Sequence, residues 1–296
     1  MKQTHIFSGS GTAIITPFRD GKIDFYLLER LIEMQIKEKT DALIVCGTTG
    51  EAATLSEDER KSVIEAAVKT VGKRIPVIAG TGCNETEKAV SRSKAAALAG
   101  ADALLIVTPY YNKASHKGLI KHYQAAACAS DLPIIVYNVP SRTGIDIDIK
   151  TYTELCDIDC ITAVKEASGS IAKATELAHE LKGRLDIYSG NDDMIVPMLS
   201  VGALGVISVV SNILPEKTHL ICERWFDGRH ADALELQLEM LDLIEALFCE
   251  VNPIPIKTAL SLIGLCTEEF RLPLCKMEEQ NKDRLIAAMK AQGLLF

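Results

Sequence analysis

Eight short apolar runs recur along the first three quarters of this chain, and each precedes a segment with the apolar spacing of an amphipathic helix. The runs are rich in β-branched residues, as expected for strands buried on both faces of a parallel sheet. We place these strands at residues 13–15, 42–45, 76–79, 103–107, 133–137, 161–165, 185–189 and 204–209. We place the helices at residues 24–39, 56–71, 85–99, 115–130, 148–156, 170–181, 192–201 and 215–226.

This alternation predicts an α/β fold, a (β/α)₈ TIM barrel, because open doubly wound sheets usually have fewer strands. The strand pattern stops after Gly228, and three helices are predicted at residues 231–250, 255–263 and 278–292. No linker rich in Pro, Gly or Ser separates the two parts. We therefore predict a catalytic barrel over residues 1–228 and a three-helix segment over residues 229–296, which packs on the barrel or supports oligomer contacts.

Composition narrows the class of function. The 296 residues are 48% hydrophobic and carry a net charge of −8, with Lys and Arg scattered, so no nucleic-acid or membrane surface is indicated. No signal sequence or membrane span is visible. The nine cysteines include no Cys-x-x-Cys, and the six histidines are dispersed. We expect reduced thiols, no metal site and a cytoplasmic protein.

Local signals mark helix ends and exclude two kinds of ligand site. Ser56 with Glu59 is a capping-box start, and Gly100 is placed as a C-terminal helix stop. Gly9-Ser10-Gly11 and Gly80-Thr81-Gly82 do not complete a dinucleotide-binding motif. Asn191-Asp192-Asp193 is too short for a calcium loop, and helix capping is its expected role.

Active sites of such barrels lie where strands pass into the following loops, and Lys165 ends the sixth run. By strand alternation Lys165 shares a face with Ala163, whose small side chain leaves room inside the barrel. A buried amine is favoured in its neutral form, which forms a Schiff base with a keto acid. The alternative is a lysine that simply reaches solvent from a strand end.

Three other strand ends carry suitable groups. The loop Gly47–Glu51 offers hydroxyls and backbone N–H groups that suit a carboxylate, or it is only a glycine-flanked turn. Tyr137 shares its face with Ile135 and can relay protons, or it is a packing residue with a hydrated tip. Arg142 suits bidentate capture of a substrate carboxylate, or it is a solvated loop arginine.

With these residues in place, the chain resembles the dihydrodipicolinate synthase family over nearly its whole length, from Gly11–Phe18 to Arg271–Leu274. Gly47–Glu51 and the strand-end lysine mark the wider pyruvate-dependent lyase superfamily. The segments Tyr137–Gly144 and Thr108–Asn112 are more particular to the synthases.

The resemblance implies that Lys165 forms a Schiff base with pyruvate and that the enamine attacks L-aspartate 4-semialdehyde, in the diaminopimelate route to lysine. It implies proton relay by Thr48 and Tyr137, with Tyr111 entering from the neighbouring subunit. It also implies that Thr49 and the backbone at Gly190 and Ile207 hold pyruvate, and that Arg142 binds the semialdehyde carboxylate. No metal or organic cofactor is implied.

The resemblance also bears on assembly and feedback. It implies a homotetramer built from two tight dimers. In lysine-inhibited members the feedback site lies at the tight dimer interface, and the matching positions are Ala52, Glu57, Arg60, Asn84, Lys88 and Tyr110. Lys88 stands where a glutamate would meet the effector's ammonium, so lysine feedback is expected to be weak or absent.

Two alternatives remain. A sister aldolase, such as N-acetylneuraminate lyase or a 2-keto-3-deoxy-sugar-acid aldolase, would keep Lys165, Tyr137 and the Gly47–Glu51 loop. Arg142 and Tyr111 argue against it. A catalytically silent barrel that serves as a sensor or scaffold would be expected to lose the lysine or its proton relay, and both are present.

Overall fold

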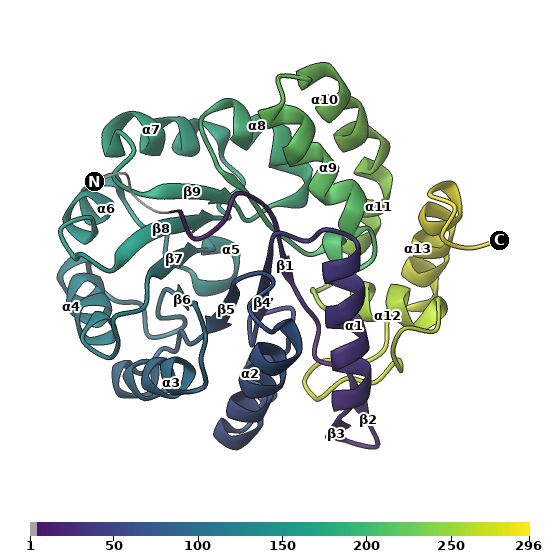
Figure 1. Cartoon of the computed structure of the whole chain (residues 1–296), viewed down its shortest axis with the longest axis horizontal. Helices are drawn as coiled ribbons and strands as arrows, with labels where there is room; N and C mark the ends of the chain where they lie inside the picture. The colour runs from purple at the N-terminus through teal and green to yellow at the C-terminus, as the bar shows by residue number, and fades with distance from the viewer. Residues whose placement is uncertain (1–4) are drawn as a thin grey trace.

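The computed structural model describes residues 5–296, and within this range eight parallel strands close the predicted (β/α)₈ barrel (Figure 1). The strands are β1 (Gly9–Ala13), β4 (Ala42–Val45), β5 (Val77–Gly80), β6 (Ala103–Val107), β7 (Ile134–Asn138), β8 (Ile161–Glu166), β9 (Asp186–Ser189) and β10 (Gly205–Ser208). They follow one another in chain order around the barrel, and β10 closes it against β1. The carboxyl ends of all eight therefore meet at one rim.

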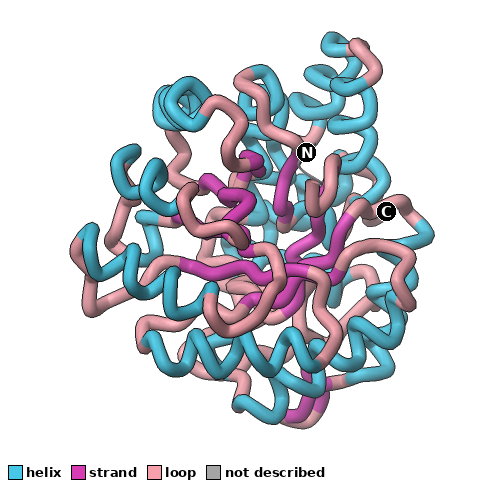
Figure 2. The backbone as a smooth tube through the Cα atoms, turned by 60° about the vertical axis from the view of Figure 1, so that its left-hand side comes forward, coloured by secondary structure: helices cyan, strands magenta, loops and turns pink. Residues whose placement is uncertain are grey.

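Helices surround the strands on the outside (Figure 2). Those between and after the barrel strands are α1 (Phe25–Lys37), α2 (Glu57–Val71), α3 (Thr86–Leu98), α4 (His116–Ala127), α6 (Ile149–Leu155), α7 (Ile171–Leu181), α8 (Ile195–Ser200) and α9 (Pro215–Phe226). The helix predicted at residues 192–201 begins as the 3₁₀ turn η2 (Asp192–Met194) and continues as α8. Elements not predicted are the hairpin β2 (Phe18–Arg19) and β3 (Lys22–Ile23), the short helix α5 (Pro140–Thr143), and the 3₁₀ turns η1 (Ala52–Thr54) and η3 (Val210–Asn212).

The hydrophobic core has two layers, which explains why the strands are apolar on both faces. Ile44, Ile135 and Ala163 belong to the cluster inside the barrel. Leu43 and Val164, on the opposite faces of their strands, belong to the larger cluster between strands and helices. Ala163 therefore lies inside the barrel, as the alternation predicted for the face of Lys165.

The first strand was misplaced by the prediction. It runs from Gly9 to Ala13, whereas the apolar residues Ile14 and Ile15 follow it. The backbones of β1 and β10 approach so closely that a Cβ on Gly205 would lie 1.8 Å from the carbonyl oxygen of Gly9. Glycine is required here by close backbone contact, which hydrophobic periodicity does not report.

Four helices follow the barrel: α10 (His230–Glu239), α11 (Leu241–Leu247), α12 (Ile254–Leu262) and α13 (Glu279–Ala291). The helix predicted at residues 231–250 is divided at Met240 into α10 and α11. The division lets the chain change partners, since α10 packs on α9 and α8 whereas α11 packs on α13 and η2. Among the described residues, no helix is long and apolar enough to cross a membrane.

The predicted helix ends are largely confirmed. Ser56 and Glu59 form the reciprocal capping box of α2, and Gly100 follows α3 with a φ of +90°. The capping role expected of Asn191-Asp192-Asp193 is wrong for its first two residues. Asn191 precedes η2 without a side-chain capping hydrogen bond, and Asp192 bonds elsewhere. Its Oδ2 accepts hydrogen bonds from the backbone N–H groups of Val209 and Val210, both at 2.9 Å, because the carboxylate faces the end of β10.

Candidate active site

A cavity of about 180 Å³, called here the inner cavity, opens where the barrel strands end. It is lined by side chains from several strand ends and from the C-terminal segment. Six predicted site residues are among its lining residues, namely Thr48, Thr49, Tyr137, Arg142, Lys165 and Gly190. The fold therefore brings together groups that lie as far apart in the sequence as the second and seventh strand–loop junctions.

Lys165 is buried, with only 6% of its surface exposed, in the wall of the inner cavity. Parallel pairing places it level with Tyr137 of β7, and its Nζ lies 4.5 Å from the centre of the Tyr137 ring. Gly190 is packed against the lysine stem, because a Cβ there would lie 3.0 Å from Cε of Lys165. The amine is thus confined by neighbours on two sides while it faces the cavity.

The Gly47–Glu51 loop is fixed from beneath. Glu51 adopts a φ of +51°, and its buried carboxylate pairs with Nζ of Lys257 at 2.5 Å. Lys257 also donates to the carbonyl of Glu269 at 2.6 Å. Burial lowers the pKa of Lys257, and the charge and hydrogen bond of Glu51 oppose that shift. The Glu51–Lys257 ion pair anchors this loop to helix α12, and the loop carries Thr48 and Thr49.

Asn252 is a site residue that the sequence analysis missed. Its Nδ2 donates to Oγ1 of Thr49 at 2.9 Å, and its carbonyl accepts from Nη2 of Arg142 at 3.1 Å. Asn252 also lines the inner cavity. It connects two predicted substrate-binding residues, but no motif marks it, since it lies in the C-terminal segment far from both in sequence.

A second cavity of about 310 Å³, called the outer cavity, shares Thr48, Tyr137, Arg142 and Asn252 with the inner one. Its walls extend to Tyr110, at the start of the loop that contains Tyr111. Tyr111 itself is 91% exposed, has a φ of +71° and lines neither of the two cavities.

Ile207 is fully buried on β10, in the cluster inside the barrel, and does not line the inner cavity. Of the predicted feedback positions, Ala52 and Arg60 line the outer cavity, as Tyr110 does. Lys88 pairs with Glu85 at 2.8 Å on the surface of α3. The roles predicted for these residues remain predictions.

No group of three or more His, Cys, Asp or Glu side chains arranged to hold a metal ion occurs within residues 5–296. The side chains that line the inner cavity include an amine, a phenol, three hydroxyls and a guanidinium. This set suits covalent capture of a carbonyl compound that carries a carboxylate.

The family is decided by a match over almost the entire chain. The model of the dihydrodipicolinate synthetase family matches residues 6–292. This chain belongs to the dihydrodipicolinate synthetase family. The family expected from the motifs is thereby confirmed.

Individual relatives agree with this membership. A protein of Clostridium novyi named 4-hydroxy-tetrahydrodipicolinate synthase is 50% identical over 285 residues, which cover 96% of each chain. One of the same name from Caldicellulosiruptor saccharolyticus is 52% identical over 98% of each chain.

Solved structures of the family superpose closely on this fold. Dihydrodipicolinate synthase of Thermotoga maritima has a TM-score of 0.96 at 41% identity, covering 98% of this chain and 100% of the other. The enzyme of Acinetobacter baumannii, described as chloride inhibited and complexed with pyruvate, has a TM-score of 0.95 at 42% identity. It covers 97% of this chain and 99% of that one.

Proposed function

We propose that this chain condenses pyruvate with L-aspartate 4-semialdehyde, as a 4-hydroxy-tetrahydrodipicolinate synthase in the diaminopimelate route to lysine. One observation carries the proposal. The buried amine of Lys165 faces a cavity that is also lined by Tyr137, Thr48 and Arg142. The names of the relatives and the pyruvate complex of the Acinetobacter baumannii enzyme support the choice of substrates.

The reaction begins when the neutral amine of Lys165 attacks the ketone of pyruvate and water leaves, which gives an imine. Loss of a methyl proton converts the imine to an enamine, whose carbon attacks the aldehyde of the second substrate. The amino group of that substrate then attacks the imine carbon, closes the ring and releases the lysine amine. Tyr137 and Thr48 carry protons between these steps.

Substrate carboxylates are assigned to different sides of the cavity. Thr49 and the backbone at Gly190 and Ile207 hold pyruvate beside Lys165. Arg142 binds the carboxylate of the semialdehyde, and its contact with the Asn252 carbonyl orients the guanidinium. The scheme requires no metal or organic cofactor.

Assembly completes the site in this proposal. Tyr111 enters the site of the neighbouring subunit of a tight dimer, and two dimers form a homotetramer. Its exposed side chain and left-handed backbone suit a residue that projects from the rim. We expect the enzyme to act in the cytoplasm, without nucleic-acid or membrane partners.

Lysine feedback is predicted to be weak or absent. The ammonium of Lys88 would repel the ammonium of a bound lysine at the expected effector position. An inhibition curve measured with both substrates at their KM tests this, and half inhibition at sub-millimolar lysine would contradict it.

A coupled assay with pyruvate and L-aspartate 4-semialdehyde tests the reaction itself. The proposal predicts turnover with the semialdehyde and none with N-acetylneuraminate in the cleavage direction. Turnover of N-acetylneuraminate or of a 2-keto-3-deoxy sugar acid, without condensation of the semialdehyde, would assign the chain to a sister aldolase.

A further inference from the structure

A buried carboxylate lies immediately beyond the reactive lysine. Glu166 follows Lys165 on β8, has 3% of its surface exposed and does not line the inner cavity, whereas Lys165 and Ala167 do. Strand alternation therefore directs Glu166 outwards, into the layer between the barrel and its helices. This carboxylate takes no part in the proposed reaction steps.

Strand pairing links Glu166 to the catalytic geometry. On β7 and β8, Tyr137 pairs with Lys165, and the next pair is Asn138 with Glu166. One pair faces the cavity and the following pair faces the helices. The side-chain contact between Asn138 and Glu166 thus lies one residue beyond the contact between phenol and amine.

Four hydrogen bonds hold the Glu166 carboxylate. Its Oε1 accepts from the backbone N–H of Ser168 at 2.7 Å and from Nδ2 of Asn138 at 3.2 Å. Its Oε2 accepts from the same Nδ2 at 3.0 Å and from the hydroxyl of Tyr152 at 3.4 Å. Burial and the charge of Glu166 raise the pKa of Tyr152 well above its ordinary value, so the phenol remains a donor.

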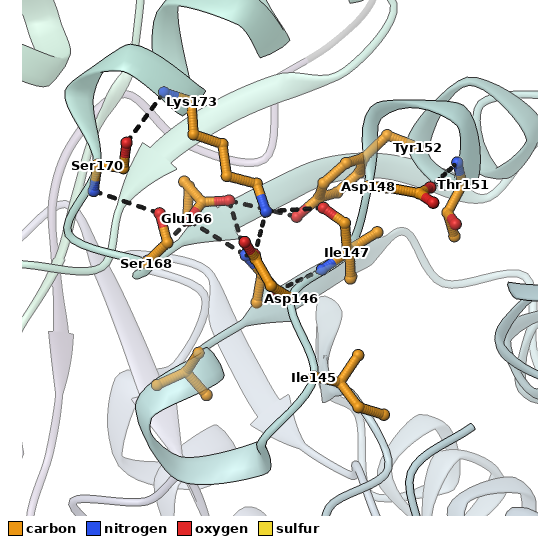
Figure 3. A network of polar contacts seen from close by, with 12 residues as sticks. Ile145, Asp146, Ile147, Asp148, Thr151, Tyr152, Glu166, Ser168, Ser170 and Lys173 are labelled. Atoms are coloured by element: carbon orange, nitrogen blue, oxygen red, sulfur yellow. Dashed lines mark hydrogen bonds and ion pairs between the residues drawn. The ribbon is translucent and has the colours of Figure 1, made fainter. Parts of the chain in front are cut away.

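The network continues into the helices that flank β8. Nδ2 of Asn138 also donates to Oδ1 of Asp146 at 2.8 Å, and Oδ1 of Asn138 accepts from the N–H of Ile147 at 3.1 Å. Lys173 of α7 pairs with Asp146 and donates to the carbonyl of Ile147 at 2.7 Å. Figure 3 shows Glu166, Asp146, Tyr152 and Lys173 converging from β8, a loop and two helices.

A buried carboxylate is costly unless its lone pairs are satisfied. Here the partners of Glu166 are an amide, a phenol and a backbone N–H, rather than an ammonium or a guanidinium. The backbone at this position is fixed as well, since the carbonyl of Glu166 accepts from the N–H of Gly190 at 2.7 Å. The contacts with Asn138, Gly190 and Tyr152 therefore fix the end of β8 relative to β7, β9 and α6. The contact with Ser168 fixes the loop that follows β8.

We propose that Glu166 is a positioning residue for the Schiff-base reaction: by holding Asn138, Ser168 and Tyr152, it fixes the ends of β7 and β8 so that Tyr137 faces Lys165. The inference rests on the proposed function, because it concerns the geometry of imine formation. Small displacements of reacting groups cost large factors in rate, about a hundredfold for 1 Å. The network would thus act on the chemistry without touching a substrate.

Glu166→Gln is the sharpest test, because the amide keeps the size of the side chain. Both carboxylate oxygens accept hydrogen bonds, so in either orientation the new NH₂ faces a donor. We expect kcat and the single-turnover rate of imine formation, quenched with borohydride and read by mass spectrometry, to fall about tenfold or more. The KM for the semialdehyde should stay within about twofold.

Two buried tyrosines provide a matched pair that separates positioning from stability. Tyr152→Phe removes one donor to Glu166, whereas Tyr123→Phe removes a bond of 3.0 Å to the carbonyl of Ile106, in the same layer beside β6. Both should lower the thermal midpoint to a similar extent. Only Tyr152→Phe should slow imine formation, by about threefold. If Glu166→Gln does not fold, this pair decides the question.

The outcomes are distinguishable. If the wild-type chain forms the pyruvate imine at the same rate as Glu166→Gln or Tyr152→Phe, the carboxylate only stabilises the fold and the positioning role is overturned. If the wild-type chain forms no imine with pyruvate, the proposed function fails, and this inference fails with it.

Discussion

Two lysines are buried at the same end of this barrel, and their surroundings differ. Nζ of Lys257 contacts the Glu51 carboxylate at 2.5 Å, the Glu269 carbonyl at 2.6 Å, and the ring of Phe18 at 4.3 Å from its centre. Nζ of Lys165 lies over one tyrosine ring and, within residues 5–296, has no ion-pair partner. Lys257 is satisfied by the fold, whereas Lys165 faces a cavity. The difference separates a structural lysine from one available for chemistry.

The comparison predicts its largest effect for Lys165→Ala. Catalysis should fall by at least about a thousandfold, because no other lysine among the described residues lines the inner cavity. The coupled condensation assay measures the loss. The thermal midpoint should stay the same or rise, since the variant removes a buried amine that forms no ion pair within residues 5–296. If the variant retained more than a tenth of the wild-type activity, Lys165 would not be the amine that forms the imine.

Lys257→Met should have the opposite profile. It leaves the Glu51 carboxylate buried without its cation, so the free energy of unfolding should fall by about 3–5 kcal/mol. Urea unfolding followed by circular dichroism measures this quantity. The double variant Lys257→Met/Glu51→Gln is the control, and it should recover much of the lost stability. A double variant no more stable than the single one would show that the ion pair is not the cause.

Tyr137→Phe tests whether catalysis at Lys165 depends on the hydroxyl of its neighbour Tyr137. The ring and its contact with Nζ remain, but the proton-carrying hydroxyl is removed. We expect kcat to fall by about a hundredfold with little change in the thermal midpoint. Tyr123→Phe, which removes a buried hydroxyl that lines neither cavity, should leave kcat unchanged. Equal kcat values in the two variants would show that the Tyr137 hydroxyl carries no proton in the reaction.

The smallest expected effect is on the pH dependence of stability, and it comes from Glu59, which shares the partner Arg271 with Glu51. The guanidinium of Arg271 donates two hydrogen bonds to the Glu59 carboxylate. The backbone N–H of Arg271 donates to the Glu51 carboxylate. The contact with Arg271 lowers the pKa of Glu59 to about 2. A depressed carboxylate pKa stabilises the folded state above the unfolded value of about 4.3, and this stability is lost as the pH falls towards 2.

Glu59→Gln should therefore weaken the dependence of stability on pH between about 4.5 and 2 without changing kcat at neutral pH. Thermal midpoints measured across that range, beside the wild-type chain, test the expectation. Parallel curves of thermal midpoint against pH for the two proteins would show that the Glu59 carboxylate does not contribute to the loss of stability in acid.

Local patterns were sufficient to predict the barrel and the inward direction of the Lys165 side chain. Eight apolar runs with intervening helices predict the fold, and the parity of Ala163 and Lys165 predicts the direction of the amine, because both depend on neighbours in sequence. Long-range contacts were not predictable in this way. Nothing in the sequence around Asn252 or Lys257 indicates that they fix Thr49 and Glu51.

The errors in the fold have the same origin. The start of β1 was missed because glycines are required there by contact with β10, a strand from the far end of the barrel. The division between α10 and α11 follows from different packing partners, which the helical periodicity of residues 231–250 does not contain. Tertiary packing decided each of these features against the local pattern.

Trapping with borohydride tests the central claim most directly. The intact protein is incubated with pyruvate, reduced, digested and sequenced by mass spectrometry. The account predicts one reduced pyruvate adduct, on the peptide that contains Lys165, and an unmodified Lys257. Absence of a pyruvate adduct, or an adduct on Lys257 instead of Lys165, would contradict it.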